Sequence, residues 1–306
     1  MALVGCVDAT MAPPTSARPE VRPSPAAITA PVTRRTEPSV ASAALATYYA
    51  RAQADMLAQG LLRTDGGGVD TPYDAETLIR NFETLAFYDE YERGRGLTRA
   101  RDTPGNLRRW VDPVRMTVEF GASVPAEQRG RDREMIDGYA DRLARVTGHP
   151  VDTRPNGNFH VMVLGEDDRP AALRRIKALV PDMNASSMAV IRNIPRSIHC
   201  LVIAFSDAQN DFVYRKAIAI VRAEHPELLR RSCVHEELAQ GMGLANDDPR
   251  ARPSIFNDDD EFALLTTHDE LLLKMLYDPR LRPGMTLEQA RPIFSTIARE
   301  LVGGPS

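Results

Sequence analysis

The chain has 306 residues, of which 43% are hydrophobic and 26% are charged, and its formal net charge is -4 at pH 7. Such a composition is typical of a globular protein with enough chain for one large domain or two small ones, and the weak negative charge excludes an electrostatic case for nucleic-acid binding. No apolar run reaches about 18 residues, so the sequence predicts no transmembrane helix.

The first residues predict a lipid anchor. Leu3, Val4 and Gly5 precede Cys6 in the pattern of a bacterial lipobox, although the charged and apolar regions of a signal peptide do not stand before them. Seven prolines between residues 7 and 40 indicate a disordered tether. We therefore expect residues 1–40 to be a lipobox remnant and tether of an exported lipoprotein, anchored on the periplasmic side of the bacterial cell envelope. The alternative is a chance cysteine near a cytosolic terminus.

Residues 41–110 are predicted to form a helical N-terminal extension. The segment 41–60 has helical composition and ends at Gly60. A second helix is predicted over residues 74–91, where apolar residues recur at helical spacing and Asp74 is a suitable N-cap.

The remaining residues, 111–306, alternate between strand and helix patterns and are predicted to form the main domain. Strands are expected at 114–120, 159–165, 199–206 and 213–221, and helices at 131–147, 169–180, 226–241 and 267–277. Thr267 and Glu270 are expected to form a capping box at the start of the last helix. The order predicts an α+β or α/β layer structure built on a mixed twisted sheet.

Two of the three cysteines lie in apolar segments of this domain. Cys200 falls in a predicted strand and Cys233 in a predicted helix. Three scattered cysteines do not form a disulfide framework or a cysteine-based zinc site. We expect two buried free thiols, with a single disulfide between them left open.

The stretch CVHEELAQGMGLANDD, residues 233–248, carries the chemistry. His235 and Glu236 open it like a zinc-peptidase helix, but H-E-x-x-H requires a second histidine at position 239, which is Ala239. His235 is therefore expected on the solvated side of the helix, near Arg231.

A register that begins one residue later preserves every spacing of H-E-x-x-H-x-x-G-x-x-H followed by Asp. In this register Glu236, Gln240 and Asn246 replace the three histidines, Glu237 keeps the glutamate, and Gly243 and Asp247 keep the turn glycine and the final aspartate. Downstream, Ser254-Ile255-Phe256 stands where a Met-turn of the form S-I-M is expected, with Phe256 in place of the methionine.

By the order and spacing of these motifs, residues 226–277 resemble a metzincin whose metal ligands have been substituted. The motifs N-F-E-x-x-A-F-x-D-E-Y at 81–91 and L-Y-x-P-x-x-R-P-G-M at 276–285 narrow the resemblance to a bacterial family catalogued only as a domain of unknown function, over about residues 75–285. The resemblance implies a zincin-like α+β fold with an active-site-type helix and a C-terminal helical subdomain. It implies no assigned activity.

The substituted ligands decide what this site is expected to do. Glu236, Gln240 and Asn246 offer only oxygen atoms, which are poor zinc ligands and suit calcium, magnesium or manganese better. We expect no cofactor, with a divalent metal as the alternative. Glu237 is the candidate general base, while Gly243, Asp247 and Phe256 are expected to shape the turns around the site.

Other polar residues receive mostly structural interpretations. His160 and His199 lie in or beside predicted strands and are within possible reach of the site, but a lone histidine is more often structural. The acidic runs at 246–248 and 257–261 lack the alternating spacing of a calcium loop and are expected to be solvated turns, except for Asp247.

Three hypotheses follow. The favoured one is a binding or structural protein of the cell envelope, without zinc-peptidase activity, whose partner is an unknown envelope protein or peptide. The second is an active metal-dependent hydrolase with an oxygen-rich metal site and Glu237 as its base. The third is an unrelated α/β domain whose helix mimics the spacing.

Overall fold

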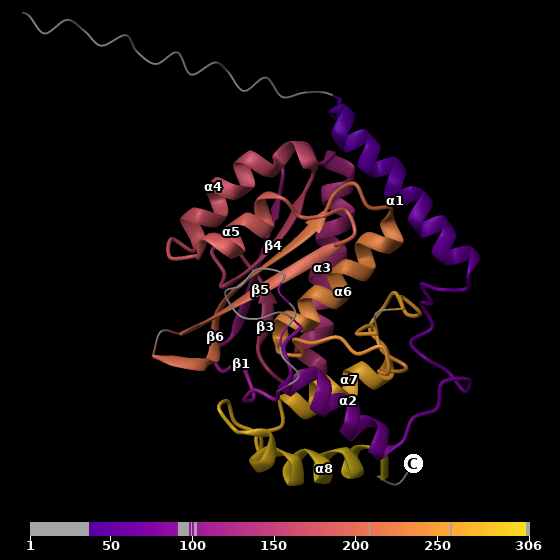
Figure 1. The fold of residues 1–306 in the computed structure, drawn as a ribbon, viewed down its shortest axis with the longest axis vertical. Coiled ribbons are helices and arrows are strands. Elements are labelled where there is room, and N and C mark those ends of the chain that lie inside the picture. The colour runs from indigo at the N-terminus through magenta and orange to yellow at the C-terminus, as the bar shows by residue number, and fades with distance from the viewer. Residues whose placement is uncertain are drawn as a thin grey trace, which may run out of the picture. The chain divides into compact units, whose positions relative to one another are not determined.

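The computed structural model describes residues 37–90, 98, 100, 103–207, 209–257 and 259–303. Residues 35–306 form one compact unit (Figure 1). Cys6, nearly all of the predicted tether and Asp258 of the second acidic run lie outside the described residues. Within the described part, no helix is long and apolar enough to span a bilayer.

The centre of this unit is a mixed sheet. Its strands are β1 (Arg109–Trp110), β2 (Val114–Phe120), β3 (Val151–Thr153), β4 (Phe159–Leu164), β5 (Cys200–Asp207) and β6 (Asn210–Arg222). Strands β1, β6, β4, β2 and β3 follow one another in parallel pairs, whereas β5 pairs antiparallel with β6. Among the described strands, β5 pairs only with β6, so one of its edges has no strand partner.

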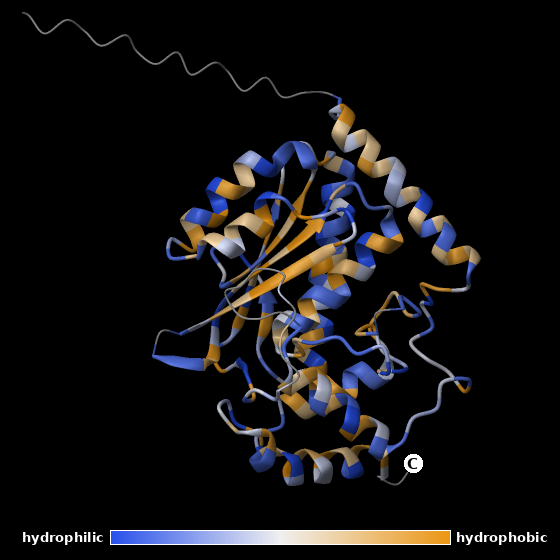
Figure 2. Cartoon of the chain, viewed as in Figure 1, coloured by the Kyte–Doolittle hydropathy of each residue, from blue (hydrophilic) through white to orange (hydrophobic). Residues whose placement is uncertain are grey.

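Helices cover both faces of the sheet. Helices α3 (Ala126–Thr147) and α6 (Glu227–Met242) pack on one face, and α4 (Arg169–Leu179) and α5 (Ala185–Arg192) on the other. The remaining described α-helices are α1 (Val40–Ala58), α2 (Ala75–Phe87), α7 (Thr267–Leu276) and α8 (Leu287–Gly303). Successive side chains of β4 point to opposite faces of the sheet. Val161 and Val163 belong to the large core, which includes residues of α3 and α6, whereas Met162 belongs to a smaller core with α4 and α5. Burial on both sides explains why β4 is apolar along nearly its whole length, as are the central strands in Figure 2 over much of theirs.

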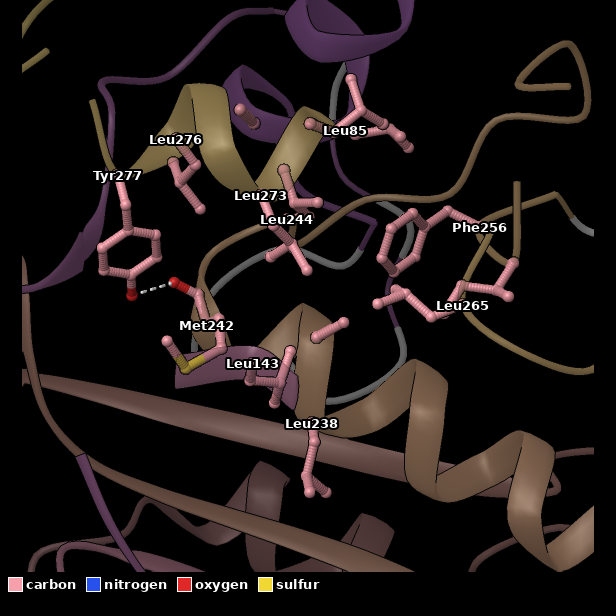
Figure 3. Close-up of a cluster of buried hydrophobic side chains, with 14 of the residues drawn as sticks. Leu85, Leu143, Leu238, Met242, Leu244, Phe256, Leu265, Leu273, Leu276 and Tyr277 are labelled. Carbon is pink, nitrogen blue, oxygen red and sulfur yellow. Dashed lines mark hydrogen bonds between the residues drawn. The ribbon is translucent and has the colours of Figure 1, made fainter. Parts of the chain in front are cut away.

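A second part of the large core lies beyond the C-terminal end of α6. There Leu85 of α2 and Leu273 of α7 pack around Leu244, which follows α6 (Figure 3). The Tyr277 hydroxyl donates a hydrogen bond of 2.9 Å to the carbonyl oxygen of Met242. Helices α2 and α7 and the residue after α7, Tyr277, therefore support the end of α6 and the loop that follows it.

The structure confirms the α+β class and corrects several details. The capping box of α7 is formed by Thr266 and Asp269, one residue earlier than predicted. Among the described residues, five elements were not predicted: the short strands β1 and β3, a 3₁₀ helix at Glu166–Asp168, and the helices α5 and α8.

Candidate functional site

Helix α6 lies close against the sheet because two glycines permit it. A β-carbon on Gly241 would lie 2.4 Å from Cζ of Phe159, and one on Gly243 would lie 2.6 Å from the carbonyl oxygen of Arg108. Trp110 donates from Nε1 to the carbonyl oxygen of Gly241 over 2.8 Å. Gly243 follows the last residue of the helix and has a φ of 131°, a conformation that favours glycine, so the chain leaves the helix there.

A cavity of about 480 Å³ lies beside α6 and β5. We call it the β5–α6 cavity. Its helical wall includes Glu236, Glu237 and Gln240, and its strand wall is formed by residues 200–204. Asp247 lines it as well. Three of the predicted helix positions and the edge strand β5 thus line the same cavity.

The carboxyl groups of Glu236 and Glu237 in this wall both have raised pKa values. Glu237 is 4% exposed, and its Oε2 atom has no hydrogen-bond partner in the described structure. Burial raises the pKa of the Glu237 carboxyl well above its ordinary value, and the charge of Asp247 raises it further. Burial likewise raises the pKa of Glu236, with Asp247 and Glu237 adding to the effect. A buried structural glutamate is normally paired, and the unpartnered oxygen of Glu237 departs from that pattern.

The side chains of Gln240 and Asn246, the other two predicted ligands, point to different partners. Gln240 donates from Nε2 to Oδ1 of Asp247 over 2.9 Å, which fixes the loop after α6 against the helix. Asn246 instead donates from Nδ2 to the carbonyl oxygen of Thr84 over 3.1 Å. Its side chain is therefore engaged with α2, and it is not among the residues that line the cavity.

The segment at the predicted Met-turn lies under this loop. Phe256 is fully buried and lies beside Leu265 (Figure 3). Asp269 accepts hydrogen bonds from the Ser254 hydroxyl at 2.6 Å and from the Ile255 amide at 3.1 Å. The turn is thus held by a buried carboxylate of α7.

Cys200 and Cys233 form a disulfide, with their Cα atoms 5.7 Å apart. The expectation of two free thiols was wrong, because β5 and α6 pack with these two positions in contact. Nδ1 of His225 lies 3.6 Å from the sulfur of Cys233. His225 is almost fully buried, and burial lowers its pKa well below the ordinary value.

The other histidines divide between the site and the core. His199 lines the cavity, and burial lowers its pKa. His160 is turned elsewhere and contacts Oε1 of Glu119 through Nδ1 at 2.8 Å.

The prediction that His235 lies on the solvated side of the helix was wrong: its side chain is buried, with 4% of the residue exposed. Its ring stacks on Tyr139 with centroids 4.0 Å apart, and its Nδ1 accepts a hydrogen bond from the amide of Leu265. Burial lowers its pKa to about 3, and the charges of Arg231 and Arg142 act in the same direction.

The donor set does not fit the zinc of a peptidase. One sulfur and two carboxylates, from Cys200, Glu236 and Glu237, have ligand atoms within 4.8 Å of one another. In the disulfide form the sulfur is bonded to Cys233, which leaves oxygen donors, while zinc prefers nitrogen and sulfur. Asn246 donates to Thr84 and does not line the cavity, so Glu236, Gln240 and Asn246 do not converge as three ligands.

Comparison with known proteins gives one relationship. The model of the family described as "Protein of unknown function (DUF2927)" matches residues 75–296. No curated protein and no solved structure matches the chain. The matched segment begins with α2 and extends into α8, so it includes the sheet, α6 and the cavity. The chain therefore belongs to the DUF2927 family of proteins of unknown function.

Proposed function

We propose that this chain is a cell-envelope binding protein on a degenerate metzincin-like scaffold, which takes an extended basic peptide segment into the β5–α6 cavity and lacks zinc-peptidase activity. The observation that carries the proposal is the buried Oε2 atom of Glu237, which has no hydrogen-bond partner in the described structure and lines the same cavity as β5, a strand with one edge that pairs with no described strand. The lipobox pattern that ends at Cys6 supports the envelope location.

Strand β5 supplies the means of holding an extended chain. It lines the cavity with residues 200–204 and pairs with β6 along one edge. The amides and carbonyls of its other edge offer the hydrogen bonds that an added strand uses. This mode of binding selects backbone shape, and the side-chain contacts then select sequence.

Glu236 and Glu237 supply the preference for positive charge. Neither carboxylate forms an ion pair with a described residue, and both belong to the helical wall of the β5–α6 cavity. A lysine or arginine side chain entering the cavity would restore the ionised form of these groups and satisfy Glu237 Oε2. A charge-assisted hydrogen bond of this kind contributes about 1.5–3 kcal/mol.

The binding is tested with a short fluorescein-labelled peptide of alternating valine and lysine and the full chain carrying Cys6→Ser. We expect saturable anisotropy changes, and E236Q and E237Q should each weaken binding about 10- to 100-fold. Glu288→Gln, an exposed position on α8, is the matched control and should bind like the parent.

A second peptide separates strand pairing from simple charge attraction. Methylation of alternate backbone nitrogens removes strand hydrogen bonds and leaves the lysines in place, so it should weaken binding to the parent. Equal affinity for both peptides, or equal affinity of all three glutamine variants, would disprove the proposal.

A metal-dependent hydrolase is the second candidate. It is favoured by Glu237, whose raised pKa and position on the cavity wall suit a general base. An oxygen-ligated cation at Glu236, with Gln240 and Asp247 nearby, would have to replace zinc. Peptide cleavage by the parent that requires Mn²⁺, Mg²⁺ or Ca²⁺, and that is lost in folded E237Q, would establish this function; a parent without turnover rejects it.

A further inference from the structure

Residues on both faces of β5 line the β5–α6 cavity. Successive side chains of a strand point to opposite faces of its sheet, and five successive residues of β5 line the cavity. Cys200, Val202 and Ala204 pack against the large core, on the face that α6 covers. Ile203 packs against the smaller core, on the face that α5 covers, and Leu201 shares this face because it lies two residues away. The cavity therefore extends over the edge of β5 that pairs with no described strand.

The α6 side of this edge is acidic. Glu236 and Glu237 line the cavity there. Burial raises the pKa of the Glu236 carboxyl, and the acidic groups that raise it further are, in decreasing order, Asp247, Glu237, Asp260 and Glu90. All of these residues line the cavity, so its negative charge is gathered near α6.

The α5 side is apolar and carries no charge. Val190 of α5 and Ile198, from the segment between α5 and β5, line the cavity together with the β5 residues of that face. Both are half-buried, so part of their apolar surface is uncovered. The other described residues between 185 and 198 that line the cavity are Ser187 and Ser197, which are neutral.

From these two walls we infer that the cavity distinguishes the alternate side chains of a bound peptide: those that face α6 are basic, and those that face α5 are apolar. The apolar subsite is formed by Val190, Ile198, Leu201 and Ile203. The inference rests on the proposed peptide binding and adds its sequence preference, which is an extended segment with a basic residue at every second position and an apolar residue between.

The geometry of a strand links the two preferences. Side chains i and i+2 of a strand share a face about 6–7 Å apart, and a paired strand places its side chains level with those of its neighbour. A peptide valine on the α5 face covers Leu201 or Ile203, and the lysine that follows it emerges on the α6 face, toward Glu237. A polar side chain on the α5 face loses water there without gaining a charged partner.

Three fluorescein-labelled octapeptides test the preference on the full chain carrying Cys6→Ser. They contain four valine–lysine repeats, four threonine–lysine repeats, or four valines followed by four lysines. Threonine has nearly the shape of valine and favours strands as well, so the first two peptides differ mainly in apolar contact. We expect the threonine peptide to bind about tenfold more weakly. The block peptide should also bind more weakly, because it presents lysines and valines on both faces.

Variants then test the subsite itself. V190T and I198T should each reduce the preference for valine over threonine at least about threefold. V69T is the matched control and should keep the parent's preference, since Val69 is fully exposed and does not line the cavity. E237Q should weaken binding of the valine and threonine peptides by the same factor, because Glu237 lies on the α6 side. Circular dichroism checks that each variant is folded.

Equal affinity of the parent for the valine and threonine peptides overturns the inference, and so does an unchanged preference in both V190T and I198T. In either case, weaker binding by E236Q and E237Q leaves the proposed peptide binding standing without the apolar subsite. Absence of saturable binding of all three peptides rejects the proposed function and the inference together.

Discussion

The pKa of Glu237 makes a prediction that needs no ligand. A carboxyl whose folded pKa lies above its unfolded value stabilises the fold below the unfolded value, and this contribution is lost as the pH rises through the folded pKa. Burial and Asp247 raise the pKa of Glu237. E237Q should therefore melt at a higher temperature than the parent at pH 8, and the difference should vanish near pH 4. Thermal unfolding at both pH values checks this, and a variant less stable at pH 8 would contradict it.

His235 predicts the opposite trend. Its folded pKa of about 3 lies below the ordinary histidine value, so its contribution is complete above about pH 6.5 and is lost as the pH falls toward 3. Replacement by Gln, which does not titrate, should flatten the acid limb of the stability curve by up to about 1.4 kcal/mol per pH unit. Urea unfolding from pH 7 to pH 4 measures both slopes, and parallel curves would refute the assignment.

Positions of individual site residues could be predicted from the sequence only within helix α6, where the spacing of about 3.6 residues per turn fixes which side chains share a face. Glu236, Glu237 and Gln240 follow from spacing on α6 and line one cavity. Asn246 comes after the turn at Gly243, where spacing no longer fixes direction, and its side chain is taken by Thr84. The disulfide depends on strand-to-helix packing, which no local pattern encodes.

At the scale of elements, α6 explains the wrong prediction for His235. A single apolar stripe implies one buried face, but α6 packs against the sheet on one side and against α3 and the loop before α7 on the other. Residues on nearly all of its circumference are therefore buried. Arg231 stays exposed, but His235, one turn later, does not.

The glycine at the crossing of α6 and the sheet gives a test of this packing. G241A would place a methyl group 2.4 Å from Cζ of Phe159, and we expect a loss of about 1–3 kcal/mol of stability. G138A on α3 is the matched control, because its β-carbon meets no atom within 4 Å, and it should gain about 0.5–1 kcal/mol. Chemical denaturation compares the two, and equal effects would argue against the close approach.

Two helix boundaries illustrate what capping patterns can and cannot decide. Both Thr266 with Asp269 and Thr267 with Glu270 fit the capping-box pattern, and the first is selected because Asp269 also accepts bonds from the 254–255 turn. Helix α8 was missed although Thr286 and Gln289 bond reciprocally at its start. The helix was not predicted because Pro292 lies inside it, and an internal proline normally indicates a helix end.

For the whole molecule, the disulfide joins the sheet layer to the helical layer. It closes a loop with a sequence separation of 33 residues, for which chain entropy predicts about 3–4 kcal/mol of stabilisation. Reduction should lower the free energy of unfolding by about this amount. Guanidinium unfolding with and without dithiothreitol measures it, and no change would mean that the bond does not form.

The class of the whole fold was predictable, because strand and helix patterns alternate along the chain: β2 alternates apolar and polar residues, and β4 is a short apolar run buried on both faces. The short strands β1 and β3 have two and three residues, too few to carry a periodic signal. They are recognised as strands only by their pairing with β6 and β2 in the sheet.

Hydrogen exchange along β5 tests the central claim most directly. The account predicts that the valine–lysine peptide slows exchange of the outward amides of β5, in the cavity-lining segment 200–204, and that the effect is lost in E237Q but kept in E288Q. Unchanged exchange in β5 at a peptide concentration that saturates binding, or protection confined to another surface, would contradict it.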